Sequence, residues 1–214
     1  MSPLDPQTRD LVRIAAAIAG ANEQITREVM QQASQTAEAT SVDEVILQSY
    51  LFSGFPRALN AARTWRAVSS QLAPAGDDSA NARHANDWER RGEKTCARVY
   101  GQSYKLLREN VRALHPALDS WMITDGYGKV LSRPELDLRR RELCIVAACA
   151  ASGQQRQLHS HFHGALNSGS NAAELDAVLE SISDLVDARD LATYRTLLSR
   201  VISRRQSSPG GDFA

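Results

Sequence analysis

Two stretches of this chain resemble each other when one is shifted by about 132 residues. The shift sets Arg9-Asp10-Leu11 on Arg141-Glu142-Leu143, and residues 44–49 on 176–181. It also sets Arg57, Leu59, Arg63 and Thr64 on Arg189, Leu191, Arg195 and Thr196. Because the agreement covers three predicted helices at one spacing, we interpret the chain as a diverged tandem duplication of a helical unit.

Apolar residues recur at helical spacing through most of the chain, as at Leu11, Ile14 and Ile18. Aromatic residues make up only 6% of the sequence, a composition that favours helix over strand. We therefore predict an all-α protein. The first unit is expected over 1–68, a polar linker over 69–87, the second unit over 88–205 and a disordered tail over 206–214.

Two breaks in the helical pattern are also predicted. Gly54 and Pro56 are expected to end one helix of the first unit before the next begins at about Arg57. The glycine-containing segment 125–129, followed by Arg133-Pro134, predicts an ordered loop in the second unit.

Charge and cysteine content exclude several classes of protein. Lys plus Arg and Asp plus Glu both number 25, so no nucleic-acid or acidic-membrane partner is expected. Three cysteines, an odd and small number, predict no disulfide framework and favour a reducing, cytoplasmic setting. Neither a basic-then-apolar leader nor a run of about 20 apolar residues is present, so no membrane segment is predicted.

Chemistry concentrates in the second unit, where residues 154–167 hold three of the five histidines. If the helix that carries Glu142 and the next one form a hairpin around Ser152 and Gly153, the carboxylate can meet an imidazole and fix its tautomer. Such a pair is a plausible proton shuttle. His159 and His163, four residues apart, offer a rival metal site, but no third ligand is evident and we predict no metal.

The spacing of these residues resembles the carboxymuconolactone decarboxylase and alkylhydroperoxidase D-like family. Redox members of that family carry Glu-x11-Cys-x2-Cys-x3-His, and counting from Glu142 reaches Gln154, Gln157 and His161. The glutamate and histidine match, whereas both thiols are missing. Further similarities lie in Gly164-Ala165-Leu166-Asn167-x-Gly169, in residues 173–175, and in the stretch 48–57 with its Gly-x-Pro ending.

The resemblance implies an all-α fold of tandem units and a decarboxylase-like activity on a small unsaturated lactone or carboxylic acid. By that resemblance no metal and no organic cofactor are needed, and His161 is the acid and base that Glu142 orients. Gln157, Arg133 and Arg141 are the candidate substrate-binding residues, because arginine grips carboxylates in a bidentate way. Arg139 is a further candidate for that role.

The family's assembly implies a homotrimer. The residues proposed for its core or interface are Tyr50, Phe52, Phe55 and Trp65. The corresponding stretch of the first unit, 22–35, contains no His and no Cys, so we expect that unit to be catalytically bare.

Two alternatives remain open from the sequence. One is a thiol-dependent peroxidase that uses Cys144 or Cys149, although their spacing of five residues inside an apolar run predicts two buried core residues about 140° apart. Cys96 lies among charged residues and is expected to be exposed. The other is a helical oligomer without chemistry, in which Glu142 and the arginines are ordinary surface charges.

Overall fold

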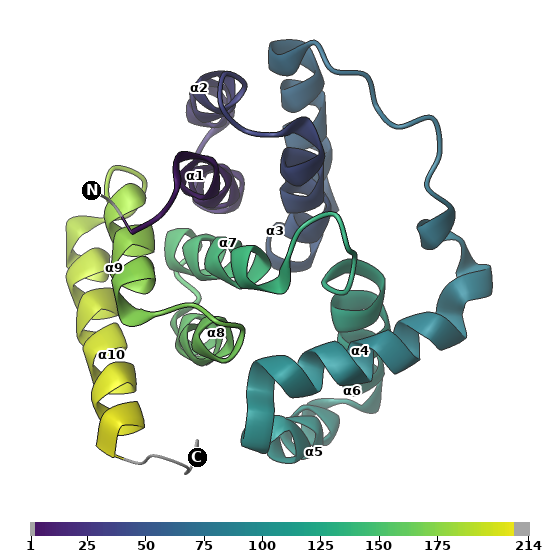
Figure 1. The fold of residues 1–214 in the computed structure, drawn as a ribbon, viewed down its shortest axis with the longest axis vertical. Helices are drawn as coiled ribbons and strands as arrows, with labels where there is room; N and C mark the ends of the chain where they lie inside the picture. Colours follow the sequence, from purple (N-terminus) through teal and green to yellow (C-terminus); the bar gives the residue numbers. More distant parts are fainter. Residues whose placement is uncertain (1–2, 208–214) are drawn as a thin grey trace.

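The computed structural model describes residues 3–207, in which every regular element is a helix, so the all-α prediction is confirmed. The helices are α1 (Pro6–Gly20), α2 (Glu23–Ala33), α3 (Ala39–Ser69), α4 (Ala85–Tyr100), α5 (Tyr104–Leu114), α6 (Pro116–Trp121), a π-helix (Met122–Val130), α7 (Leu138–Ala151), α8 (Gln155–Asn167), α9 (Ala172–Ser181) and α10 (Ala188–Ser207). In Figure 1, α7 lies at the centre of the molecule, with α1 on one side of it and α8 on the other.

The central position of α7 follows from its sequence, which is apolar on every side after Glu142. Leu143, Ile145 and Val146 are completely buried, against α1, α3, α8 and α9. A fully buried Leu or Ile side chain contributes about 1.5–3 kcal/mol through the hydrophobic effect. This helix therefore anchors the core of both halves. No helix within residues 3–207 is long and apolar enough to cross a membrane.

Several helix boundaries recur at the shift of 132 residues. The side chain of Asp5 caps α1 by accepting from the Thr8 amide, and that of Asp137 caps α7 by accepting from the Arg140 amide. The first residues of α2 and α8, Glu23 and Gln155, are related by the same shift. These boundaries agree with a duplication, which itself stays a prediction.

Helix α3 contains the predicted break. It runs as one element from Ala39 to Ser69, but Gly54 inside it has φ of +78° and ψ of 163°, which kinks the chain two residues before Pro56. A positive φ suits glycine because it has no Cβ. The kink leaves Phe52 at the end of the first half of α3, where its ring faces α8.

The segment 125–129 is not a loop, which corrects the prediction from its glycines. It belongs to the π-helix, whose backbone touches that of α4 at two glycines. A Cβ on Gly128 would lie 1.9 Å from the Trp88 carbonyl oxygen, and one on Gly92 would lie 2.0 Å from that of Ile123. Here glycine permits close packing of two helices rather than a turn.

The predicted linker, 69–87, is partly helical and is tied to the second unit. Two short 3₁₀ turns, Asp78–Ala80 and Ala82–His84, precede α4, which begins at Ala85. The Trp88 indole donates to the Ser79 carbonyl oxygen over 3.0 Å.

At the other end of the unit, α10 continues to Ser207, so the first two residues of the predicted tail are helical. Residues 208–214 lie outside the described residues.

Candidate functional site

Glu142 and His161, the two residues predicted as catalytic, are in contact. Glu142 lies in the second turn of α7 and His161 in the middle of α8, and the two helices form a hairpin that turns at Gly153. Glu142 Oε2 lies 2.8 Å from His161 Nδ1. Glu142 is completely buried and His161 is 5% exposed. With Nδ1 engaged by the carboxylate, Nε2 is the ring nitrogen left for a reacting group.

Neighbouring residues hold this pair in place. The ring of Phe52, at the α3 kink, meets the His161 ring edge to face at a centroid distance of 5.8 Å. Gly164 lies one turn after His161 on α8, and a Cβ there would come within 2.5 Å of Glu142 Oε2 and 2.7 Å of Val99 Cγ1. The carboxylate therefore occupies space that only a glycine at position 164 leaves open.

The second carboxylate oxygen of Glu142 faces a different environment. Glu142 Oε1 is buried and makes no hydrogen bond within residues 3–207. Two tyrosines lie in the same interior region, with the rings of Tyr100 and Tyr127 6.2 Å apart. Burial raises the pKa of both hydroxyls, and the negative charge of Glu142 raises each further, so both stay protonated at neutral pH. Sequence reasoning missed Tyr127 because it assigned the residue to a loop.

All three cysteines are buried, which confirms the prediction for Cys144 and Cys149 and overturns it for Cys96. Cys96 shares one face of α4 with Gly92 and Val99, and this face turns inward. Burial raises the pKa of each thiol to about 12. Catalysis by thiolate requires a lowered pKa, so none of the three has the environment of a nucleophilic cysteine.

The candidate substrate arginines are occupied by carboxylates of the chain itself. Arg141 is completely buried, and its Nη2 lies 2.7 Å from Glu44 Oε2 on α3. Arg133 Nε lies 2.9 Å from Glu44 Oε1, and its Nη1 lies 2.9 Å from Asp77 Oδ2 in the linker. A guanidinium that is already neutralised is a weak clamp for an incoming carboxylate.

The remaining candidates lie apart from that ion-pair network. Arg139 pairs with Glu174 at the start of α9. Gln157, the third predicted substrate-binding residue, is exposed one turn before His161. The roles of Gln157, Arg133 and Arg141 toward a substrate stay predictions.

His159 and His163 lie on another face of α8, and their rings contact each other at a centroid distance of 5.0 Å. Burial lowers the pKa of both, that of His163 to about 3, and the adjacent His159 and two arginines contribute to the shift of His163. Residues 3–207 contain no group of three or more His, Cys, Asp or Glu side chains placed to hold a metal ion. The two histidines instead line a cavity of about 170 Å³ together with Tyr100 and Asn167.

Comparison with known protein families places the pair in a recognised segment. Residues 120–190 match the model of the Carboxymuconolactone decarboxylase family. The matched segment covers about a third of the chain. It includes both Glu142 and His161, and the resemblance drawn from their spacing is confirmed over this part of the chain. No curated protein matches the sequence.

Proposed function

We propose that the chain is a carboxymuconolactone decarboxylase-like enzyme in which His161, oriented by Glu142, transfers a proton to a small unsaturated lactone acid. The observation that carries the proposal is the buried contact of 2.8 Å between His161 Nδ1 and Glu142 Oε2, inside the segment that matches the family model. A buried carboxylate that fixes one nitrogen of an imidazole leaves the other nitrogen to act as acid and base.

In the proposed reaction, the bond between the substrate's carboxylate carbon and its ring carbon breaks. Its electron pair enters the conjugated system of the lactone, and carbon dioxide leaves. Nε2 of the His161 imidazolium then gives its proton to a ring carbon, and the neutral imidazole takes a proton from water. Glu142 stays ionised throughout and holds the Nδ1–H group, as a carboxylate does when it orients a catalytic histidine.

The burial of the thiols favours this proposal over the alternative of a thiol peroxidase. A peroxidase cysteine must be accessible and ionised, whereas the three thiols here are buried with a pKa of about 12. Titration of the native protein with a chromogenic disulfide at pH 8 is expected to show no fast-reacting thiol. After unfolding in guanidinium, all three thiols are expected to react with the reagent.

The proposal is tested with a panel of five-membered unsaturated lactones that carry a carboxylate. Carbon dioxide release gives the rate, and turnover in D₂O is expected to leave deuterium on the protonated ring carbon. His161→Gln is expected to lower kcat by about 10²–10⁴-fold, because loss of a general acid or base has effects of this size. His159→Gln is the matched control, since it changes another histidine of the same helix that does not touch Glu142.

The outcomes separate the hypotheses. Retained turnover in His161→Gln, with His159→Gln equally active, would contradict the assignment. If the folded wild-type protein converts none of these acids, the helical oligomer without chemistry becomes the better description. Rapid thiol labelling of the native protein would revive the peroxidase.

A further inference from the structure

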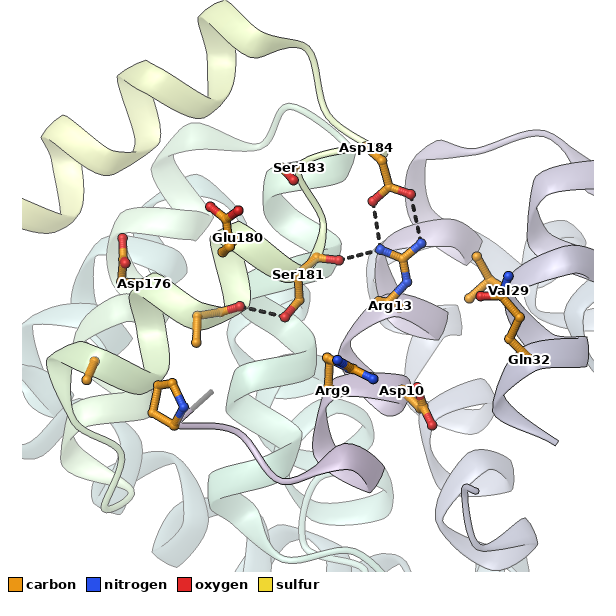
Figure 2. A pocket seen from close by; sticks show the side chains of 13 residues that line it. Arg9, Asp10, Arg13, Val29, Gln32, Asp176, Glu180, Ser181, Ser183 and Asp184 are labelled. Atoms are coloured by element: carbon orange, nitrogen blue, oxygen red, sulfur yellow. Dashed lines mark hydrogen bonds and ion pairs between the residues drawn. The ribbon is translucent and has the colours of Figure 1, made fainter. Parts of the chain in front are cut away.

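Figure 2 shows a cavity of about 820 Å³ between α1, α2 and α9, whose charged side chains are paired within the chain or exposed to water. Arg13 is held by Asp184 through two contacts of 2.7 and 2.8 Å. The side chains of Asp176 and Glu180 are 64% and 68% exposed. The interior around Glu142 is different, because one oxygen of this completely buried carboxylate has no hydrogen-bond donor within residues 3–207.

The oxygen without a donor, Oε1, carries part of the negative charge of Glu142. The other oxygen, Oε2, contacts His161 Nδ1, and the proposed reaction needs the carboxylate to stay ionised while His161 is charged. A buried charge is stable only when hydrogen bonds within the protein replace those that water gave it. The proposed proton transfer therefore requires a donor for Oε1.

The groups near this carboxylate, apart from His161 on α8, are four neutral side chains. Burial raises the pKa of each, and the charge of Glu142 raises it further, so all four keep their protons at neutral pH. They are Cys96 and Tyr100 on α4, Tyr127 on the π-helix and Cys149 on α7. A thiol is a weak donor, whereas a phenol hydroxyl is a good one. A tyrosine is therefore the suitable donor for Oε1.

Of the two tyrosines, Tyr127 is the one that needs a partner inside the protein. Tyr100 lines the cavity of about 170 Å³ beside His163, from which water can reach it. Tyr127 is only 4% exposed. A phenylalanine at this position would fill the same space without burying a hydroxyl group, so the hydroxyl itself requires an acceptor.

The π-helix fixes the position of Tyr127. Its wide turn is seen in the 2.9 Å bond from the Leu131 amide to the Gly126 carbonyl oxygen, five residues earlier. Such turns are rare and occur frequently at functional sites. Gly128 holds the adjacent backbone against α4, and the ring of Tyr127 meets that of Tyr100 edge to face at a centroid distance of 6.2 Å. Both contacts restrict where the Tyr127 hydroxyl can lie.

We propose that Tyr127 is a positioning residue of the Glu142–His161 site, and that its hydroxyl is the hydrogen-bond donor for Glu142 Oε1. Because no direct hydrogen bond reaches Oε1 within residues 3–207, one bound water or a small rotation of the side chains completes the link. In either form the link holds the carboxylate in its charged state and leaves the transferable proton on His161. The inference deepens the proposed function and rests on it for its kinetic consequence.

The test is Tyr127→Phe, which removes the hydroxyl and keeps the ring. Without its donor the ionised carboxylate loses stability relative to the neutral carboxyl group, so the proton shared by the pair moves from His161 to Glu142. At the pH at which the pair holds one proton, Tyr127→Phe is expected to show the infrared carbonyl band of a protonated carboxyl group. Addition of Glu142→Gln is expected to remove that band. The ¹⁵N signals of His161 are expected to move from the imidazolium to the neutral imidazole position.

Turnover measures the kinetic consequence. Tyr127→Phe is expected to lower kcat at least about tenfold with KM unchanged, because the hydroxyl acts on Glu142 and not on the substrate. Tyr194→Phe is the matched control, since Tyr194 on α10 is also buried, at 3% exposed, and its pKa is raised by burial, Asp190 and Cys149. This control is expected to change neither the spectra nor kcat.

Three results would overturn the inference. One is a folded Tyr127→Phe variant that lacks the carboxyl band and keeps the His161 signals of the wild type. Another is the same spectral change in Tyr194→Phe. The third is found in protein that keeps Tyr127 and carries ¹³C at the tyrosine Cζ atoms, where Glu142→Gln is expected to shift the Tyr127 signal and an unshifted signal contradicts the link. If no lactone acid is converted, these spectra still decide the role of Tyr127, so the two proposals fail separately.

Discussion

Glu44→Gln is expected to destabilise the protein strongly while leaving its shape unchanged. Glu44 lies on α3 and is 3% exposed, and it is the only carboxylate that contacts Arg141 within residues 3–207. The substitution preserves the size of the side chain but removes its charge. Burial lowers the pKa of the Arg141 guanidinium, and Glu44 beside it opposes that shift. Removing Glu44's charge therefore leaves a cation in the core without a counterion.

The magnitude follows from what Arg141 retains. Its side chain still donates to the Leu136 carbonyl oxygen over 3.0 Å and to the Arg133 carbonyl oxygen over 3.1 Å, so its hydrogen bonds are largely preserved and the lost term is electrostatic. Breaking a buried ion pair by removing one partner costs about 3–5 kcal/mol. For a chain of this length, that loss lowers Tm by about 6–20 °C.

Urea unfolding followed by circular dichroism gives the change in free energy, and calorimetry gives the change in Tm. Asp87→Asn provides a control, because the Asp87–Arg90 pair lies on the surface with both side chains more than half exposed, and no measurable change is expected there. A loss below about 1 kcal/mol for Glu44→Gln would refute the reasoning, since that is the range of surface pairs.

Two further predictions concern the interior of the second unit. Gly164→Ala is expected to displace Glu142 and to lower turnover at least about tenfold, with a loss of about 1–3 kcal/mol in stability from overpacking. Gly76→Ala, where no atom lies within 4 Å of the added Cβ, is expected to change neither quantity, and unaltered kinetics in Gly164→Ala would contradict the described packing. The second prediction is that acid unfolding depends on His163, whose pKa falls from its ordinary value of 6.5 to about 3 on burial. The unfolded chain binds this proton between pH 6.5 and 3 and the folded chain does not, so stability falls as the pH is lowered through that window. His163→Gln is expected to flatten the urea-measured stability in this range, and an unchanged slope would show that His163 does not titrate as described.

Sequence reasoning located Glu142 and His161 because their contact depends on local information. Two helices joined by a short turn bring residues 19 positions apart into reach, and the turn was marked by Gly153. The hairpin alone predicted contact between Glu142 and one of three histidines, and the spacing that resembles the family singled out His161. Cys144 and Cys149 were predicted as buried for a similar reason, since the apolar run around them is continuous. What one helix or one hairpin determines can be predicted from such patterns.

The errors arose where packing between distant segments decides the outcome. Glu44 and Arg141 are separated by 97 residues, and no local pattern pairs them. Glycines in 125–129 predicted a turn, whereas their small size serves contact between the π-helix and α4. The burial of Cys96 had a local signal that neighbouring charges obscured, because Gly92, Cys96 and Val99 recur at helical spacing on one face.

The contact between α4 and the π-helix also sets the limits of a unit that could fold alone. The family match begins at residue 120, two residues before the π-helix, whereas α4 ends at Tyr100. A fragment cut at the matched boundaries would lose Val99, which covers Gly164, and would lose the helix against which Gly128 packs. It would also lose Glu44 and leave Arg141 without its carboxylate. An excised fragment of residues 120–190 would thus expose Glu142 to water. The environment of His161 therefore depends on residues that lie outside the segment matched by the family model.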